Sequence, residues 1–154
     1  MGDGGRLPWR LPGELRHFRA RTQGCPVILG RQSFAEIGKP LPGRHLIVLT
    51  RDPGSLDIPP DPGIEAAGSL DGALSAAAAA ARRLQAHTIW AGGGRGVWAA
   101  CMPLATRLEI TRVALRPAGD TRFPAIDADT WHCRHTGAWQ NDAAAWRLEN
   151  YTRR

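Results

Sequence analysis

The sequence predicts an α/β fold in which a mostly parallel central sheet is flanked by helices and followed by a C-terminal antiparallel hairpin. Between residues 26 and 91, short apolar runs that favour strands alternate with helix-compatible segments. Beyond Pro103, apolar and polar residues alternate instead, which is typical of strands with one buried face. This order of patterns indicates parallel strands with crossover helices first and antiparallel strands last.

Three apolar runs, at residues 26–29, 46–50 and 87–91, are predicted to form the parallel strands. The clearest helix is predicted over residues 69–84, because a serine can cap its first turn and a run of alanines precedes two arginines at its end. Residues 51–63 are rich in proline and glycine and are therefore predicted to form a loop.

Two further strands are predicted near the end of the chain. Leu108, Ile110 and Val113 mark the first, and Trp146 and Leu148 mark the second. No strong helical pattern separates them, so a terminal antiparallel hairpin is the simplest arrangement. With 154 residues, 43% hydrophobic content and no internal repeat, we expect one domain spanning residues 1–154.

The composition argues against several classes of protein. No stretch has the length and apolarity of a membrane span, and no secretion signal is recognisable, so a cytoplasmic protein is expected. Cys25, Cys101 and Cys133 do not have metal-binding spacing, and no metal is expected. The net charge of +6 suits a polyanionic partner, but the arginines are scattered and Lys39 is the only lysine. Nucleic acid is therefore not an expected partner.

Glu14 is the first candidate for chemistry. It follows Pro12, which suits the first turn of a helix, and Leu15 and Phe18 would lie on one face of that helix. A carboxyl group beside an apolar face is partly desolvated, which raises its pKa and allows proton chemistry near neutral pH. An exposed acid that favours the helix dipole is the alternative, and spacing alone favours that alternative.

Glycine and arginine residues indicate a second candidate site. Gly92, Gly93 and Gly94 follow a predicted strand and precede helix-like residues, a layout that lets backbone amides approach a pyrophosphate. Arg31 and Ser33 likewise follow a strand and begin a short predicted helix. The glycine run is neither a Walker loop nor a full dinucleotide fingerprint, and a single arginine is more often a solvated surface charge.

Five sequence blocks occur in order along the chain. They read LPWRLPGELRHF at residues 7–18, PVILGRQSF at 26–34, IGKPLPGR at 37–44, GGG at 92–94 and GDTRFP at 119–124. In content, order and spacing these blocks resemble the dihydrofolate reductase family. The resemblance implies a monomeric enzyme that reduces 7,8-dihydrofolate to 5,6,7,8-tetrahydrofolate, with hydride transferred from NADPH to pterin C6 and a proton delivered to N5.

The resemblance also implies a set of substrate-binding residues. Glu14 becomes the ionisable group of the pterin pocket, Thr111 donates a hydrogen bond to its carboxylate, and Trp9 closes the pocket. An arginine fork is well shaped to bind the carboxylate of the substrate's glutamate tail. The remaining implied substrate-binding residues are Leu15, Phe18, Ile37 and Arg44.

A larger set is implied to bind NADPH. Its members are Leu7, Gly30, Arg31, Ser33, Thr50, Arg51, Gly92, Gly93, Gly94, Arg95 and Trp98. The arginine and hydroxyl groups among them favour the 2′-phosphate of NADPH over NADH. The family further implies a cis peptide between two of the glycines and a lid over the nicotinamide at roughly residues 2–9.

Two departures from the family pattern concern the cofactor end of the site. Between Gly94 and Met102 the chain has one residue more than usual, so either Val97 or Trp98 can occupy the aromatic position beside the nicotinamide, and Trp98 is favoured. Ala91 stands where a larger aliphatic side chain is usual next to the pterin.

A third departure concerns the first strand. The family has a central strand before the point at which this sequence begins, so we expect an N-terminally truncated domain with an empty position in its sheet. Unpaired backbone and uncovered apolar surface would consume much of a total stability of roughly 5–15 kcal/mol. The missing strand leaves an inactive fragment or a basic polyanion-binding module as alternatives. A separate alternative is a related reductase that acts on another heterocycle, as in riboflavin synthesis.

This expectation is tested by comparing the 154-residue chain with a version extended upstream by an in-frame apolar strand. The short chain is expected to fold poorly or to have little activity, and the extended chain to be an ordinary reductase. The measurement is the rate of NADPH oxidation with dihydrofolate, and full activity of the short chain would contradict the expectation.

Overall fold

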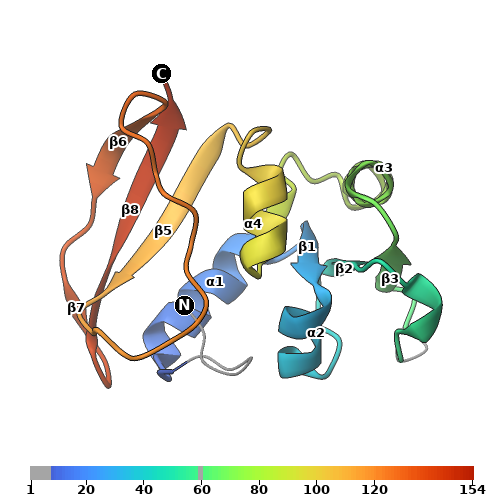
Figure 1. Ribbon diagram of the computed structural model, residues 1–154, viewed down its shortest axis with the longest axis horizontal. Helices are drawn as coiled ribbons and strands as arrows, with labels where there is room; N and C mark the ends of the chain where they lie inside the picture. The colour runs from blue at the N-terminus through green and yellow to red at the C-terminus, as the bar shows by residue number, and fades with distance from the viewer. Residues whose placement is uncertain (1–7, 59–60) are drawn as a thin grey trace. The chain divides into compact units, whose positions relative to one another are not determined.

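The computed structural model describes residues 8–58 and 61–154, which divide into two compact units (Figure 1). One unit contains residues 8–19 together with Met102–Arg154, and the other contains Ala20–Cys101. Within the described ranges, no helix has the length and apolarity needed to cross a membrane. That residues 1–154 act as one domain stays a prediction.

The unit Ala20–Cys101 contains a parallel four-stranded sheet in the order β3-β2-β1-β4. Its strands are β1 (Pro26–Gly30), β2 (His45–Leu49), β3 (Ile64–Ala67) and β4 (Trp90–Gly93). The expected strands at residues 26–29 and 46–50 are confirmed, and their unbroken apolar runs are buried. β4 begins later than the predicted run, and the sequence did not indicate β3, in which only the two end residues are buried.

Helices cover both faces of this sheet (Figure 1). They are α2 (Arg31–Ile37), α3 (Leu70–Leu84) and α4 (Arg95–Cys101), and a short 3-10 helix η1 (Pro53–Ser55) follows β2. Side chains alternate along a strand, so Ile28 faces the core that contains residues of α3 and α4. Its neighbours Val27 and Leu29 face the other core, to which α2 contributes Phe34.

The long helix α3 agrees with the prediction over residues 69–84. The side chain of Ser69 accepts a hydrogen bond of 3.1 Å from the amide of Gly72, which satisfies one of the free donors of the first turn. The alanine run lets the helix lie close to the sheet, because Ala73, Ala77 and Ala80 are fully buried along one face.

The other unit contains an antiparallel sheet in the order β5-β8-β6, with β7 also paired to β8. Its strands are β5 (Arg107–Val113), β6 (Trp131–Thr136), β7 (Gln140–Asn141) and β8 (Ala145–Arg153), and α1 (Pro12–Thr22) begins in this unit. The expected antiparallel pairing of the last two predicted strands is confirmed as β5 with β8. The sheet is wider than the predicted hairpin, because β6 and β7 also pair with β8. The sequence did not indicate β6, because its residues after Trp131 are exposed and lack the alternation that marks a strand.

β4 carries an irregularity at the glycine run. Ile28 of β1 pairs with Ala91, but Leu29 pairs with Gly93, so Gly92 is an extra residue in the β4 ladder. A Cβ atom at position 92 would lie 2.8 Å from Val27 Cγ1 and 2.9 Å from Leu29 Cδ2. Gly92 is therefore required by space at this position.

The substitution Gly92→Ala is expected to lower the free energy of unfolding by about 1–3 kcal/mol, because the added methyl overpacks the β1 side of the core. Chemical denaturation measures the change. The control is Gly96→Ala, since no atom lies within 4 Å of a Cβ built at position 96 in α4, and alanine there should be neutral or stabilising. Equal stability of the two variants would contradict the assignment.

Candidate active site

A carboxyl group and a hydroxyl group from distant parts of the sequence meet in the first unit, which contains the antiparallel sheet. Glu14 lies in the first turn of α1, and Thr111 lies near the end of β5. Thr111 Oγ1 donates a hydrogen bond of 3.2 Å to Glu14 Oε1. The pairing predicted for these two residues is therefore present.

The environment of Glu14 favours its protonated form. Burial raises the pKa of the Glu14 carboxyl above its ordinary value, and the hydrogen bond from Thr111 and the charge of His17 only partly oppose that effect. His17 lies one helical turn after Glu14, with its Nε2 3.8 Å from Glu109 Oε2. His17 is not among the residues predicted from the sequence, although its i+3 spacing from Glu14 indicates that the two side chains are neighbours on the helix.

The apolar residues around Glu14 are only partly covered. Leu11 is 1% exposed and belongs to the core, but Leu15 is 47% exposed and Phe18 is half-buried. An exposed leucine beside a desolvated carboxyl is available to contact a ligand. Trp9, also half-buried, lies just before the helix. Leu7 and most of the expected lid at residues 2–9 lie outside the described residues.

Apart from Leu7, the predicted cofactor residues lie in the second unit, Ala20–Cys101, which contains the parallel sheet. Gly30 ends β1, Thr50 follows β2, and Gly93 ends β4. These three strands are parallel neighbours in the sheet, so their carboxyl ends lie along the same edge. In open α/β sheets this edge is where ligands bind.

At this edge, glycines let two turns approach closely. A Cβ atom at Gly30 would lie 3.5 Å from the amide nitrogen of Gly94, and one at Gly94 would lie 3.1 Å from Ser33 Oγ. The peptide bond between Gly93 and Gly94 is cis, which confirms the expectation of a cis bond within the glycine run. Backbone groups of both turns and the Ser33 hydroxyl thus converge in one place.

The positions of Val97 and Trp98 on α4 differ in burial. Val97 is 3% exposed and belongs to the core beneath the sheet. Trp98 is half-buried, and its ring lies against Gly93, because a Cβ at Gly93 would lie 2.5 Å from Trp98 Cζ2. Of the two, Trp98 is the aromatic side chain placed at the cis peptide.

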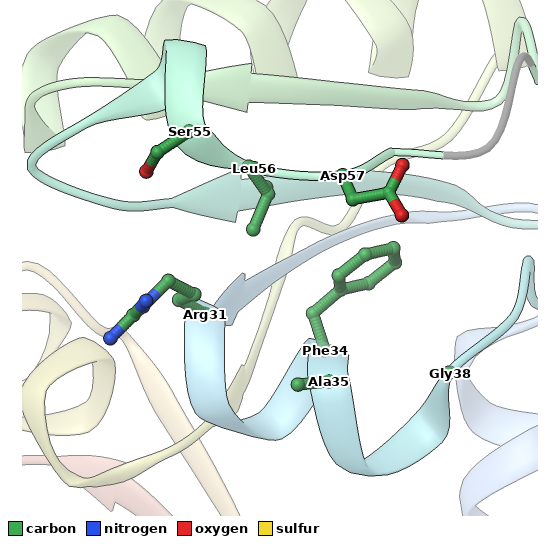
Figure 2. A pocket seen from close by; sticks show the side chains of 7 residues that line it. All are labelled: Arg31, Phe34, Ala35, Gly38, Ser55, Leu56 and Asp57. Carbon is green, nitrogen blue, oxygen red and sulfur yellow. The ribbon is translucent and has the colours of Figure 1, made fainter.

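Arginine side chains surround this edge. Arg31, Arg51 and Arg95 are exposed, and none of them has a carboxylate partner among the residues that the structure describes. Arg31 also borders a cavity of about 520 Å³ between α2 and the segment after η1 (Figure 2). The residues lining this cavity are Arg31, Phe34, Ala35, Gly38, Ser55, Leu56 and Asp57. Positive charge is therefore available for an anionic ligand at the Arg31 end.

The remaining predicted substrate residues belong to the second unit. Ile37 ends α2, is half-buried and packs against the core of Val27 and Phe34. Arg44 immediately precedes β2, and its Nη1 donates a hydrogen bond of 3.4 Å to Thr22 Oγ1. That contact holds the guanidinium at one end, and the roles of Ile37 and Arg44 toward substrate stay predictions.

Comparisons with known proteins agree on one family. A family model described as dihydrofolate reductase matches residues 1–153. The chain is 40% identical over 124 residues to dihydrofolate reductase type 3 of Salmonella typhimurium, covering 80% of this chain and 70% of that protein. It is 35% identical over 158 residues to dihydrofolate reductase of Mycobacterium tuberculosis, covering 99% and 88%.

A solved structure shows a similar fold. The dihydrofolate reductase from Enterococcus faecalis complexed with NADP(H) and RAB-propyl superposes with a TM-score of 0.80 at 30% sequence identity. The match covers 99% of this chain and 88% of that one. The arrangement of parallel and antiparallel strands is thus shared over nearly the whole length.

Glu14→Gln is expected to make the protein more stable at neutral pH. Because the pKa of Glu14 is raised on folding, the stabilising contribution of its neutral form is complete below the unfolded pKa and is lost as pH rises through the folded pKa. The variant cannot ionise, so its advantage should be near zero at pH 4 and should grow as the pH is raised to 8. Urea denaturation at both pH values measures this, and an advantage that does not grow with pH would contradict the raised pKa.

Proposed function

The chain belongs to the dihydrofolate reductase family, and from this membership we propose that it catalyses the NADPH-dependent reduction of 7,8-dihydrofolate to 5,6,7,8-tetrahydrofolate. The observation that carries the proposal is the partly buried carboxyl of Glu14, which is bound by Thr111 and has a raised pKa. Perturbed carboxyl groups of this kind are characteristic of sites that perform proton chemistry.

Glu14 binds the pterin ring. Its carboxylate accepts hydrogen bonds from the ring's amino group and an adjacent ring N–H, in a two-point, charge-assisted contact. Thr111 holds one oxygen of the same carboxyl and thereby limits its rotation. The negative charge beside the ring favours protonation of the pterin, and a water near Glu14 delivers the proton to N5.

The exposed apolar surface next to Glu14 suits a flat heterocycle. Leu15 and Phe18 follow Glu14 on α1, and Trp9 precedes it, so these side chains contact the ring. In the second unit, Ile37 adds apolar contact and Arg44 binds the carboxylate of the substrate's glutamate tail, for which a planar guanidinium is well shaped.

The residues at the carboxyl edge of the parallel sheet suit a phosphate-bearing cofactor. Gly30 and Gly94 leave the space that a Cβ would fill, and Ser33 Oγ lies beside Gly94. Arg31, Thr50, Arg51 and Arg95 supply the positive and hydroxyl groups that bind phosphates, including a 2′-phosphate. When bound, NADPH supplies the hydride. Leu7, Gly92, Gly93 and Trp98 are the other residues that we assign to the cofactor.

The wider setting follows from the same membership. We infer that the protein acts on its small-molecule substrate in the cytoplasm, as a monomer, without a metal.

The experiment is an assay of NADPH oxidation by the wild-type chain with dihydrofolate and, separately, with a pyrimidine of the riboflavin-pathway type. Turnover of dihydrofolate is expected, and Glu14→Gln should lower kcat/KM for it by roughly a hundredfold or more, because the carboxylate is lost from the reacting end of the pocket. Turnover of the pyrimidine alone would contradict the proposal.

The matched control is Glu36→Gln, which removes an exposed carboxylate from α2 in the other unit. Its kcat/KM should stay within about twofold of the wild-type value, since surface charge changes have small effects. An equal loss in both variants would show that the effect is general and not specific to Glu14.

A further inference from the structure

The helix that carries Glu14 lacks a side-chain cap of its own. The carbonyl of Leu11 accepts the first helical hydrogen bond, from the amide of Leu15 at 3.0 Å, so Leu11 is the N-cap residue immediately before α1. Leucine has no oxygen in its side chain, and Pro12 has no amide hydrogen. The first amide of the helix that needs a partner is therefore that of Gly13.

Asp142 supplies that partner from the far end of the chain. It follows β7 in the turn that leads to β8, and its Oδ2 accepts a hydrogen bond of 2.5 Å from the amide of Gly13. The two residues are separated by 129 positions in the sequence. A backbone hydrogen bond of 3.3 Å from the amide of Asp142 to the carbonyl of Ala144 closes the turn that presents the carboxylate. Asp142 thus performs the task of an N-cap residue without belonging to the helix.

Gly13 is required for this contact. A Cβ atom at position 13 would lie 2.7 Å from Asp142 Oδ2 and 3.1 Å from Trp146 Cζ2. Trp146 is 3% exposed on β8 and cannot move aside without disturbing the core. A side chain at position 13 would therefore displace the Asp142 carboxylate from the Gly13 amide and press against the Trp146 ring.

The cap affects what Glu14 can do. Glu14 is the third residue of the helix, the position from which a glutamate often turns back and caps the first turn with its own carboxylate. Here the carboxyl instead accepts the hydrogen bond from Thr111 on β5. Because Asp142 accepts the Gly13 amide, the first turn of α1 is held without a contact from the Glu14 carboxyl.

We propose that Asp142 is a positioning residue for Glu14: by capping α1 from the β7–β8 turn, it keeps the Glu14 carboxyl directed to Thr111 and to the pterin. The role in turnover rests on the proposed function, whereas the geometry does not. His17 on α1 is the charged group that acts on the Glu14 carboxyl, Glu109 on β5 lies beside His17, and Asp142 binds the amide of Gly13.

The test compares Asp142→Ala with Asp142→Asn. Without the cap, the Glu14 carboxylate becomes the acceptor for the amides of the first turn, and such donors lower the pKa of a carboxyl. Asp142→Ala should therefore lower the pKa of Glu14 and reduce kcat roughly tenfold, with a smaller change in KM. Asp142→Asn keeps an oxygen acceptor, so it should restore kcat to within about twofold of wild type.

The direct readout is a ¹³C NMR titration of the Glu14 side-chain carboxyl, assigned by the loss of its signal in Glu14→Gln. This titration needs no turnover, so it tests the positioning role even if the wild-type chain fails to reduce dihydrofolate, which would overturn only the proposed function. An unchanged Glu14 titration in Asp142→Ala would overturn the positioning role.

Two further variants separate positioning from general stability. Gly13→Ala removes the same contact from the other side and should reproduce the Asp142→Ala titration, and the double variant should add little to either single one. Asp127→Ala is the matched control, because Asp127 also accepts a backbone amide, that of Asp129 at 3.0 Å, in the same unit. The control is expected to lose thermal stability without any change in the Glu14 titration; a shift equal to that of Asp142→Ala would overturn the proposal.

Discussion

The proposed chemistry depends on the desolvation of the Glu14 carboxyl, which forms no salt bridge with any residue that the structure describes. In the unit with the antiparallel sheet, Glu14 and Glu149 are both at least partly buried but have opposite surroundings. Glu149 is 5% exposed, and its burial is outweighed by hydrogen bonds from Arg112, Tyr151 and Arg147, so its pKa is lowered. Glu14 accepts a hydrogen bond from the Thr111 hydroxyl, and its pKa is raised by burial. The hydrogen bonds to Glu149 favour its ionised form, which suits a structural ion pair, whereas the raised pKa of Glu14 suits a group that exchanges a proton.

In the unit with the parallel sheet, the three consecutive glycines leave space that side chains would fill. Gly92 is held in the β4 ladder where a methyl group would overlap β1, and Gly93 has φ of 114° beneath the Trp98 ring. Gly94 leaves room beside the Ser33 hydroxyl. A side chain would meet different neighbours at each of the three positions, so the glycines have different structural roles although they form one run in the sequence.

Much of the fold could be predicted from the sequence, because buried strands and the α3 helix carry strong local patterns. The pairing of Glu14 with Thr111 was reached only through resemblance, since nothing local to either residue indicates the other. Asp142 and His17 were missed for a related reason. An exposed aspartate in a turn has no periodicity to mark it, and its partner is a backbone amide that any residue but proline would provide.

The pairing of β5 with β8 determines which chemical group Glu14 meets. Thr111 is opposite Leu148 in this register, and its neighbour Arg112 points to the other face, where its Nε lies 2.8 Å from Glu149 Oε2. A slip of one residue would turn every side chain over and offer Glu14 a guanidinium in place of a hydroxyl. A cation there would hold the carboxyl ionised across the neutral pH range. The Arg112–Glu149 ion pair, on the opposite face of the sheet from Thr111, therefore favours the register that presents a hydroxyl to Glu14 and so helps to keep the pKa of Glu14 raised without touching it.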